Sequence, residues 1–253
     1  MRLNVIGSSP ALPRPGGACS CYLVRTDEAA VVLDLGVGAF SKLQLAIEYA
    51  RLDAIVISHM HADHYFDVVP AYYTLKYGHV RLDRRLPLWL PPGGGAALEA
   101  LRRAASADEY EDFFESAFTV REYDPAKPLA VKDLRLHFAR TRHFIEAYAI
   151  RAESGTASVT YSADTAPCES VVELARESGL FLCETALGLA LEKGERGHCS
   201  AAEAGEMAAQ AQAGRLLLTH YPAAYAAAQL VDAAKARFDG PVEAAEDGLA
   251  AAV

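Results

Sequence analysis

The sequence predicts one α/β domain in which helices cover the outer sides of two β-sheets. Three observations lead to this fold class. Of the 253 residues, 52% are apolar and 23% are charged, which is ordinary for a globular protein with a substantial core. Both halves of the chain begin with strand-like runs and continue with helix-like stretches. No linker, low-complexity segment or tandem repeat divides them, so we expect residues 1–253 to form a single domain.

In the first half of the chain, strands are predicted from short apolar or alternating runs, which are separated by residues that favour turns. A helix is expected at residues 41–49, where Leu43, Ile47 and Ala50 lie near one face, and another at residues 67–77. Strands are expected at residues 3–6, 20–25, 30–35 and 55–58. The last of these strands leads directly into the most unusual segment of the chain.

The rest of the chain repeats this order. A strand at residues 86–90 stops at Pro91-Pro92-Gly93-Gly94-Gly95. Ser200 is an expected N-cap, with Glu203 three residues on as in a capping box. Helices are expected at residues 96–105, 109–118, 170–177, 200–211 and 230–238. Strands are expected at residues 119–123, 134–139, 147–152, 158–162, 181–183, 215–219 and 241–245, with a turn at 247–248.

A cluster of metal-competent side chains follows the strand at residues 55–58. His59, His61, Asp63 and His64 lie within six residues, and the whole chain has only 8 histidines. A polar surface loop is therefore a poor explanation. Imidazoles and a carboxylate suit zinc or a similar transition metal, and open sheets tend to place ligands at the carboxyl ends of their strands.

Three later residues follow apolar runs in the same way. They are His143, Asp164 and His220. Any one of them alone is more often a cap or a turn residue than a ligand. Together with the histidine cluster, they indicate a site for two metal ions at one edge of the sheets.

The whole pattern resembles the metallo-β-lactamase superfamily, in which His-x-His-x-Asp-His precedes a lone His, a lone Asp and a final His. The resemblance covers nearly the whole chain and implies a four-layer αββα sandwich. Leu33-Asp34-Leu35-Gly36 is similar to the superfamily's Asp-x-Gly motif. By this resemblance, Asp34 is structural and orders the metal loop.

The resemblance also implies which side chains hold two divalent ions. Asp164 would bridge them, and Asp63 would also orient the attacking water. One ion would be held by His59, His61 and His143, and the other by Asp63, His64 and His220. Two ions about 3.5–4 Å apart can share a hydroxide and clamp a phosphodiester or carbonyl oxygen. Zinc is the default ion, and manganese or iron would accept the same ligands.

A second resemblance narrows the reaction. The segments at residues 180–185, 197–204 and 216–222 are similar, in order and kind, to those of ribonuclease Z and related phosphodiesterases. By this resemblance, His198 is the general acid that protonates the leaving oxygen, and Glu184 orients it. Cys199 departs from the small hydroxyl residue that is usual there. The competing interpretation is that His198 is an ordinary loop residue. The motif on both sides of His198 disfavours this interpretation.

The expected substrate is a small phosphodiester such as cyclic AMP. The segment between His143 and Asp164 is too short for the long basic arm that tRNA-maturing ribonuclease Z enzymes carry. The formal net charge of −9 also disfavours a generally basic surface for nucleic acid. A tRNA 3′-processing endonuclease that uses a dimer partner's surface is the main alternative, so RNA remains the second choice of partner.

Two further alternatives are weaker. A lactone or thioester hydrolase of the same fold would not need the motif around His198. A metal-bound scaffold protein would not need every ligand and the acid to be intact. Flavodiiron proteins replace a histidine with a carboxylate and add a flavin domain. Neither feature is found in this sequence, which excludes that class.

The segment at about residues 76–123 is an insert that is individual to this chain. Its basic opening consists of Lys76, His79, Arg81, Arg84, Arg85 and Trp89. This opening fits a nucleotide-binding flap beside the metal site and a solvated turn equally well. Its aromatic cluster fits core packing or a homodimer contact; it consists of Tyr110, Phe113, Phe114 and Phe118.

The amino-terminal segment and the cysteines complete the expectations. Gly7-Ser8-Ser9-Pro10 resembles a first loop whose amides could meet a phosphate, and a surface turn explains it nearly as well. The 5 cysteines are odd in number and scattered, which favours a reducing cytoplasm over a disulfide framework. We expect Cys19 and Cys21 to be packed rather than metal-bound. No signal peptide or membrane-spanning segment is expected.

Overall fold

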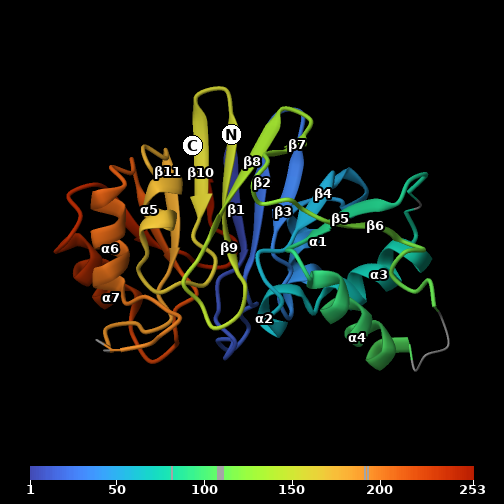
Figure 1. Cartoon of the computed structure of the whole chain (residues 1–253), viewed down its shortest axis with the longest axis horizontal. Coiled ribbons are helices and arrows are strands. Elements are labelled where there is room, and N and C mark those ends of the chain that lie inside the picture. Colours follow the sequence, from blue (N-terminus) through green and yellow to red (C-terminus); the bar gives the residue numbers. More distant parts are fainter. Residues whose placement is uncertain (81, 107–110, 191, 193) are drawn as a thin grey trace.

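Two seven-stranded β-sheets lie face to face in this computed structural model, and helices cover the outer side of each (Figure 1). The structure describes residues 1–253 apart from 81, 107–110, 191 and 193. This is the four-layer αββα arrangement that the sequence predicts. Within the described residues, every helix is too short or too polar to cross a membrane.

The first sheet has the strand order β14-β1-β2-β3-β4-β5-β6. β3 to β6 run parallel to one another, so their carboxyl ends meet at one edge. Its strands are β1 (Arg2–Gly7), β2 (Cys21–Arg25), β3 (Ala30–Leu33), β4 (Ala54–Val56), β5 (Leu86–Leu90), β6 (Phe118–Glu122) and β14 (Ala250–Ala252). Its helices are α1 (Ala39–Ala46), the 3-10 helix η1 (Tyr49–Arg51), α2 (Ala62–Tyr65), α3 (Val68–Tyr77) and α4 (Gly94–Ser106).

The second sheet has the strand order β13-β12-β11-β10-β9-β8-β7. β10 to β13 run parallel, and β8 points the same way because two antiparallel pairings separate it from β10. Its strands are β7 (Leu129–Val131), β8 (Leu134–Arg140), β9 (Tyr148–Ser154), β10 (Ala157–Tyr161), β11 (Leu180–Glu184), β12 (Leu216–Thr219) and β13 (Val242–Ala244). Its helices are α5 (Glu169–Leu174), α6 (Ala201–Gln210) and α7 (Ala227–Lys235).

Alternation along the strands builds three apolar layers. In β2, Tyr22 and Val24 pack between the two sheets, whereas Cys21 and Leu23 pack under the helices of the first sheet. Side chains of a strand point to opposite faces in turn, so one strand serves two cores. A third apolar layer joins the second sheet to α5, α6 and α7.

One predicted helix, at residues 109–118, is wrong in its described part. Residues 111–117 form turns, and Phe118 begins β6, where it pairs with Leu86 of β5. Phe113, Phe114 and Phe118 have a helix-compatible spacing and are all buried, which confirms that they pack in the core. The strand pairing of Phe118 overrides the local helical pattern. Tyr110 lies outside the described residues.

Other differences are smaller. α1 ends at Ala46 rather than near Tyr49, because Ile47 adopts an extended conformation before η1 begins. The short elements β7, β14 and α2 are not predicted from the sequence. Ser200 caps α6 through the expected capping box with Glu203.

Candidate metal centre

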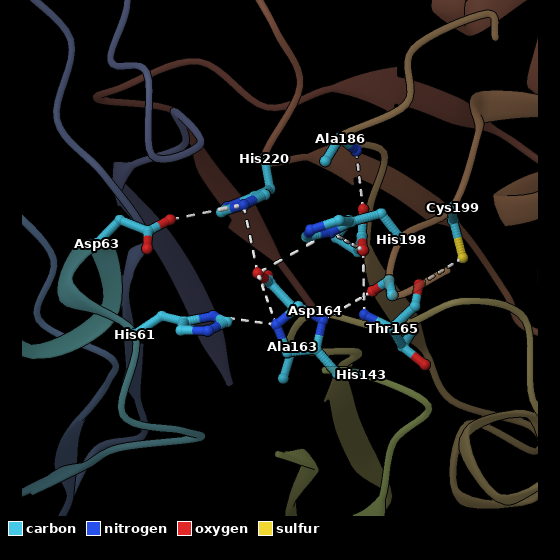
Figure 2. Close-up of polar contacts among 12 residues, drawn as sticks. His61, Asp63, His143, Ala163, Asp164, Thr165, Ala186, His198, Cys199 and His220 are labelled. Atoms are coloured by element: carbon cyan, nitrogen blue, oxygen red, sulfur yellow. Dashed lines mark hydrogen bonds and ion pairs between the residues drawn. The ribbon is translucent and has the colours of Figure 1, made fainter. Parts of the chain in front are cut away.

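The predicted ligands gather at one edge of the two sheets. The segment with His59, His61, Asp63 and His64 follows β4 and enters α2. The other ligands come from the second sheet: His143 follows β8, Asp164 follows β10 and His220 follows β12. Figure 2 shows His61, Asp63, His143 and His220 around Asp164. The structure thus brings together residues that are far apart in the sequence, while their roles as ligands remain predictions.

One cluster consists of His59, His61, His143 and Asp164. His61 Nδ1 lies 3.2 Å from His59 Nε2 and 3.0 Å from His143 Nε2. Asp164 Oδ2 lies 3.7 Å from His59 Nε2 and 3.9 Å from His143 Nε2. Three ring nitrogens and a carboxylate oxygen therefore face a common point, as zinc requires.

The second cluster consists of Asp63, His64, Asp164 and His220. Asp63 Oδ2 lies 3.5 Å from His64 Nε2 and 3.7 Å from His220 Nε2. Asp164 Oδ1 lies 3.4 Å from His64 Nε2, and Asp164 Oδ2 lies 3.5 Å from His220 Nε2. Asp164 therefore belongs to both clusters and is the side chain that a bridging role would need.

Two buried atoms of the second cluster show that the donor set fits a cation. Among the described residues, His64 Nε2 and Asp164 Oδ1 are buried without a hydrogen-bond partner. Buried polar atoms are normally paired, because leaving them unpaired is costly. A cation at this point would satisfy both atoms.

The protonation states also favour metal binding. Burial lowers the pKa of His59 well below its usual range, and burial likewise lowers the pKa values of His61 and His143. Metal ligation needs neutral imidazoles, so these rings are prepared for it. Burial acts to lower the pKa of His64 too, but the carboxylates of Asp164 and Asp34 outweigh it and raise that pKa. This position therefore concentrates negative charge that a cation can balance.

Groups behind the ligands fix the orientation of the rings. His64 Nδ1 lies 2.7 Å from Asp34 Oδ2, and His220 Nδ1 lies 2.9 Å from Ser20 Oγ. His143 Nδ1 lies 2.8 Å from the carbonyl oxygen of Gly197. Each contact leaves the Nε2 atom of the same ring facing the clusters. Such outer partners set the tautomer and the aim of a metal-binding histidine.

Asp34 is the centre of this outer layer. It accepts hydrogen bonds from the backbone N–H of Ser58 at 2.7 Å, the Ser58 hydroxyl at 2.8 Å and the Tyr161 hydroxyl at 2.9 Å. This agrees with the structural role that the resemblance implies for Asp34. Asp34, Ala163 and His220 all have φ between 50° and 58°. This left-handed backbone is costly for residues other than glycine and often marks a functional site.

His198 and Glu184 form a hydrogen-bonded pair next to the clusters. Nδ1 of His198 lies 2.8 Å from Oε1 of Glu184 and 4.0 Å from Oδ2 of Asp164. Glu184 is held in turn by the backbone N–H groups of Thr165 at 3.0 Å and Ala186 at 2.7 Å. Burial acts to lower the pKa of His198, but the hydrogen bond and the charge of Glu184 outweigh it and raise the pKa to about 9. The pair therefore favours a protonated imidazole.

A cavity of about 520 Å³ opens onto these groups. His198 lines the cavity together with two members of the first cluster and three of the second, Asp164 being shared. Its full lining consists of Pro10, Ala11, Leu12, His61, Ala62, Asp63, Asp164, Ala186, His198, His220 and Pro222. A substrate of limited size could therefore reach the clusters and His198 at the same time.

The structure corrects two ideas about the surroundings. The amide of Ser8 donates to Asp247 and the amide of Ser9 donates to Ala18, so neither is available for a phosphate. Arg84 and Arg85 precede β5, whereas the histidine segment follows its parallel neighbour β4. Arg84 and Arg85 therefore lie at the sheet edge opposite the clusters and form no flap beside them, and Arg81 lies outside the described residues.

The cysteines take no part in the centre. Cys19 and Cys21 are buried and packed, as expected. Burial raises the pKa of Cys19 to about 11 and that of Cys21 well above its usual range. Such thiols are poor sources of the thiolate that metal ligation needs.

Comparison with known proteins agrees with the fold. A family model described as a beta-lactamase superfamily domain matches residues 31–221. The chain is 32% identical over 252 residues to the uncharacterized protein ML1173 of Mycobacterium leprae, covering 98% of this chain and 87% of that protein. It is 29% identical over 251 residues to YhfI of Bacillus subtilis, named a probable metallo-hydrolase, with 98% of each covered.

Solved structures show the same fold. The crystal structure of YhfI superposes with a TM-score of 0.88 at 26% identity and covers 99% of each chain. The short form of human tRNase Z shares the fold, with a TM-score of 0.75 at 19% identity over 100% of this chain and 99% of that one. The chain belongs to the metallo-β-lactamase superfamily. Within it, the chain is a metallo-hydrolase with His and Asp clusters that can hold metal.

Proposed function

We propose that this protein is a dinuclear metal-dependent phosphodiesterase that hydrolyses a small phosphodiester, such as cyclic AMP. The observation that carries the proposal is the His198–Glu184 pair, because His198 lines the same cavity as members of both clusters. A general acid beside the metals is what the departure of an alkoxide from phosphorus needs. Carbonyl esters whose leaving group is better than an alkoxide, such as thioesters, need a general acid less.

The metals of the proposal are two divalent ions, with zinc first and manganese or iron as alternatives. When bound, they stabilise negative charge on the phosphoryl oxygens and make water more acidic. We assign one ion to His59, His61 and His143 and the other to Asp63, His64 and His220. Asp164 is assigned to both, because its Oδ2 lies 3.7 Å from His59 Nε2 of one cluster and 3.5 Å from His220 Nε2 of the other.

The chain's own groups have distinct tasks in the proposed reaction. Glu184 accepts a hydrogen bond from Nδ1 of His198, so Nε2 is the atom that gives its proton to the leaving oxygen. The carboxylate of Asp63 lines the cavity and orients the attacking water. Because both groups line one cavity, attack and proton donation can occur on a single bound phosphodiester.

Charge and size support a small substrate. The formal net charge is −9, and the described lining of the cavity contains no lysine or arginine. The chain between His143 and Asp164 is occupied by β9 and β10 and carries no long arm. Binding of tRNA depends on contacts between basic side chains and phosphates. Five free cysteines fit a cytoplasmic enzyme.

A tRNA 3′-processing endonuclease is the second candidate. It is supported by the fold shared with human tRNase Z and by the motif around His198. In this case a surface of a second copy in a homodimer would have to bind the tRNA. A lactone or thioester hydrolase is the third candidate, and the His198–Glu184 pair disfavours it.

The deciding experiment compares turnover of cyclic AMP and of a 3′-extended tRNA by protein reconstituted with zinc or manganese. Bis-p-nitrophenyl phosphate and a thioester serve as generic substrates. We expect hydrolysis of cyclic AMP and of the generic phosphodiester, with little cleavage of tRNA. Preference for tRNA would support the second candidate, and hydrolysis of the thioester alone would support the third.

A further inference from the structure

The loop at residues 8–18 is fixed firmly beside the cavity. Asp247 accepts hydrogen bonds from the backbone N–H of Ser8 at 3.1 Å, the Ser8 hydroxyl at 2.9 Å and the backbone N–H of Ala18 at 2.8 Å. Lys42 Nζ lies 2.5 Å from the same carboxylate. One half-buried aspartate therefore holds both ends of the loop.

This fixed loop presents an apolar side chain to solvent. Leu12 is 82% exposed and lines the cavity with Pro10 and Ala11. A single exposed leucine is ordinary on a protein surface. Here, however, the backbone that carries it is fixed, and the cavity that it lines is the one with His198 and Asp164. A molecule bound in this cavity can therefore contact Leu12 as well as these two groups.

The charged group closest in sequence to Leu12 is already engaged. Arg14 Nη2 lies 2.5 Å from the Ser8 hydroxyl, and Arg14 Nη1 lies 3.4 Å from the carbonyl oxygen of Tyr221. The Arg14 guanidinium also lies over the Tyr221 ring at 4.3 Å. With Pro222 and Ala186 on the same cavity, this side of the site is apolar rather than cationic. It suits an uncharged, flat organic group better than a second phosphate.

We propose that Pro10, Ala11 and Leu12 form a wall against which the organic part of the phosphodiester packs, and that Leu12 determines specificity for a substrate with a nucleobase. This inference rests on the proposed function, because the phosphodiester group is taken to lie at the clusters. Burial of the face of a base against Leu12 would contribute through the hydrophobic effect. The wall would favour a nucleoside cyclic phosphate over the same sugar phosphate without its base.

The test is steady-state kinetics of the metal-loaded Leu12→Ala variant. The two substrates are cyclic AMP and ribose 3′,5′-cyclic phosphate without a base. We expect the KM for cyclic AMP to rise about five- to tenfold, as loss of most of a leucine contact implies. The kcat for cyclic AMP and the KM for the base-free substrate should change little. Leu12→Met should restore the KM for cyclic AMP.

Leu45→Ala is the matched control, because Leu45 is 89% exposed on α1 and does not line the cavity. The inference is overturned if Leu12→Ala leaves the KM for cyclic AMP unchanged or lowers kcat equally for both substrates. A change of oligomeric mass on gel filtration would also overturn it, since Leu12 would then belong to a contact between copies.

Binding separates this inference from the proposed function. If the wild type hydrolyses neither phosphodiester, the proposed function fails. Equilibrium dialysis with cyclic AMP still tests the wall without turnover. Weaker binding to Leu12→Ala than to the wild type would support the wall, whereas equal binding or no binding would overturn it.

Discussion

At the scale of single residues, the candidate metal centre depends on hydroxyl groups that the sequence does not mark. The histidines are visible because they are rare and clustered. Tyr161 closes an apolar strand and would pass for a core residue, yet its hydroxyl donates to Asp34. Ser20, which contacts His220, has no spacing relation to the histidine segment. The candidate ligands, and Asp34 behind them, could therefore be predicted from the sequence, but the hydroxyl groups that complete the outer layer could not.

Tyr161→Phe tests this outer layer. The change removes the hydroxyl that donates to Asp34 and leaves the ring in the core. Because Asp34 orients His64, we expect metal affinity to fall about 10–100-fold. Metal titration against a chromophoric chelator would measure it. Tyr49→Phe is the control, since its buried hydroxyl bonds only to Val80 in the described structure. Equal metal affinity of the two variants would contradict the role of Tyr161.

His198→Ala tests the proposed acid. We expect turnover of cyclic AMP, whose leaving group is an alkoxide, to fall by about 10²–10⁴, the usual loss for a general acid. Metal content should be unchanged, because His198 belongs to neither cluster assigned to an ion. Metal analysis of the purified variant checks this point. His137→Ala, at a half-exposed position of β8, should keep full turnover. Loss of metal from His198→Ala would show that His198 is a ligand instead.

At the scale of elements, strand ends could be predicted better than the chain between them. The apolar runs before His59, Asp164 and His220 all became strands, because buried strands have a strong and simple signal. Residues 111–117 carry a helical spacing of aromatics but form turns. The conformation of this segment is set by the pairing of β5 with β6. This is a long-range contact, and a local sequence pattern does not contain it.

Gly36→Ala tests how closely two segments approach at the centre. A Cβ atom on Gly36 would lie 2.0 Å from the carbonyl oxygen of Asp63 and 2.8 Å from Cys19 Cβ. The histidine segment would have to move, so we expect a loss of about 3 kcal/mol in unfolding free energy together with weaker metal binding. Denaturant unfolding and metal analysis measure the two effects.

Gly95→Ala is the control for this substitution. Its Cβ atom would meet only the side chain of Glu122, at 3.2 Å, near the start of α4. We expect this variant to keep its metal and nearly all of its stability. If Gly36→Ala behaved in the same way, the close approach of Gly36 to Asp63 would not constrain the centre.

At the scale of the whole molecule, the candidate centre joins the two sheets. His59, His61, Asp63 and His64 follow the first sheet, whereas His143, Asp164 and His220 follow the second. The fold class and this joint edge could be predicted from the sequence, because seven candidate ligands that follow strands need a common edge. The wall around Leu12 could not, since it depends on how Asp247 fixes a loop at the other end of the chain.

Metal removal should therefore lower the stability of the entire fold. A ligand that binds only the native state at 100 times its Kd adds about 2.7 kcal/mol to the unfolding free energy. We expect EDTA to lower Tm by several degrees and added zinc to restore it, as measured by calorimetry. Asp164→Ala, which removes the shared carboxylate, should lose most of this response. A Tm that is independent of zinc in the wild type would contradict the assignment.

The division of the ligands between the sheets also orders the events of biosynthesis. The ribosome makes His59 to His64 first, and neither cluster has its members until His143, Asp164 and His220 have followed. A short stretch of three imidazoles and one carboxylate without these partners is an incomplete site and holds metal weakly. The first sheet also needs β14, which is made last and pairs with β1. We therefore expect tight metal binding only once both sheets have formed, so that cellular metal supply acts on the folded protein rather than on the growing chain.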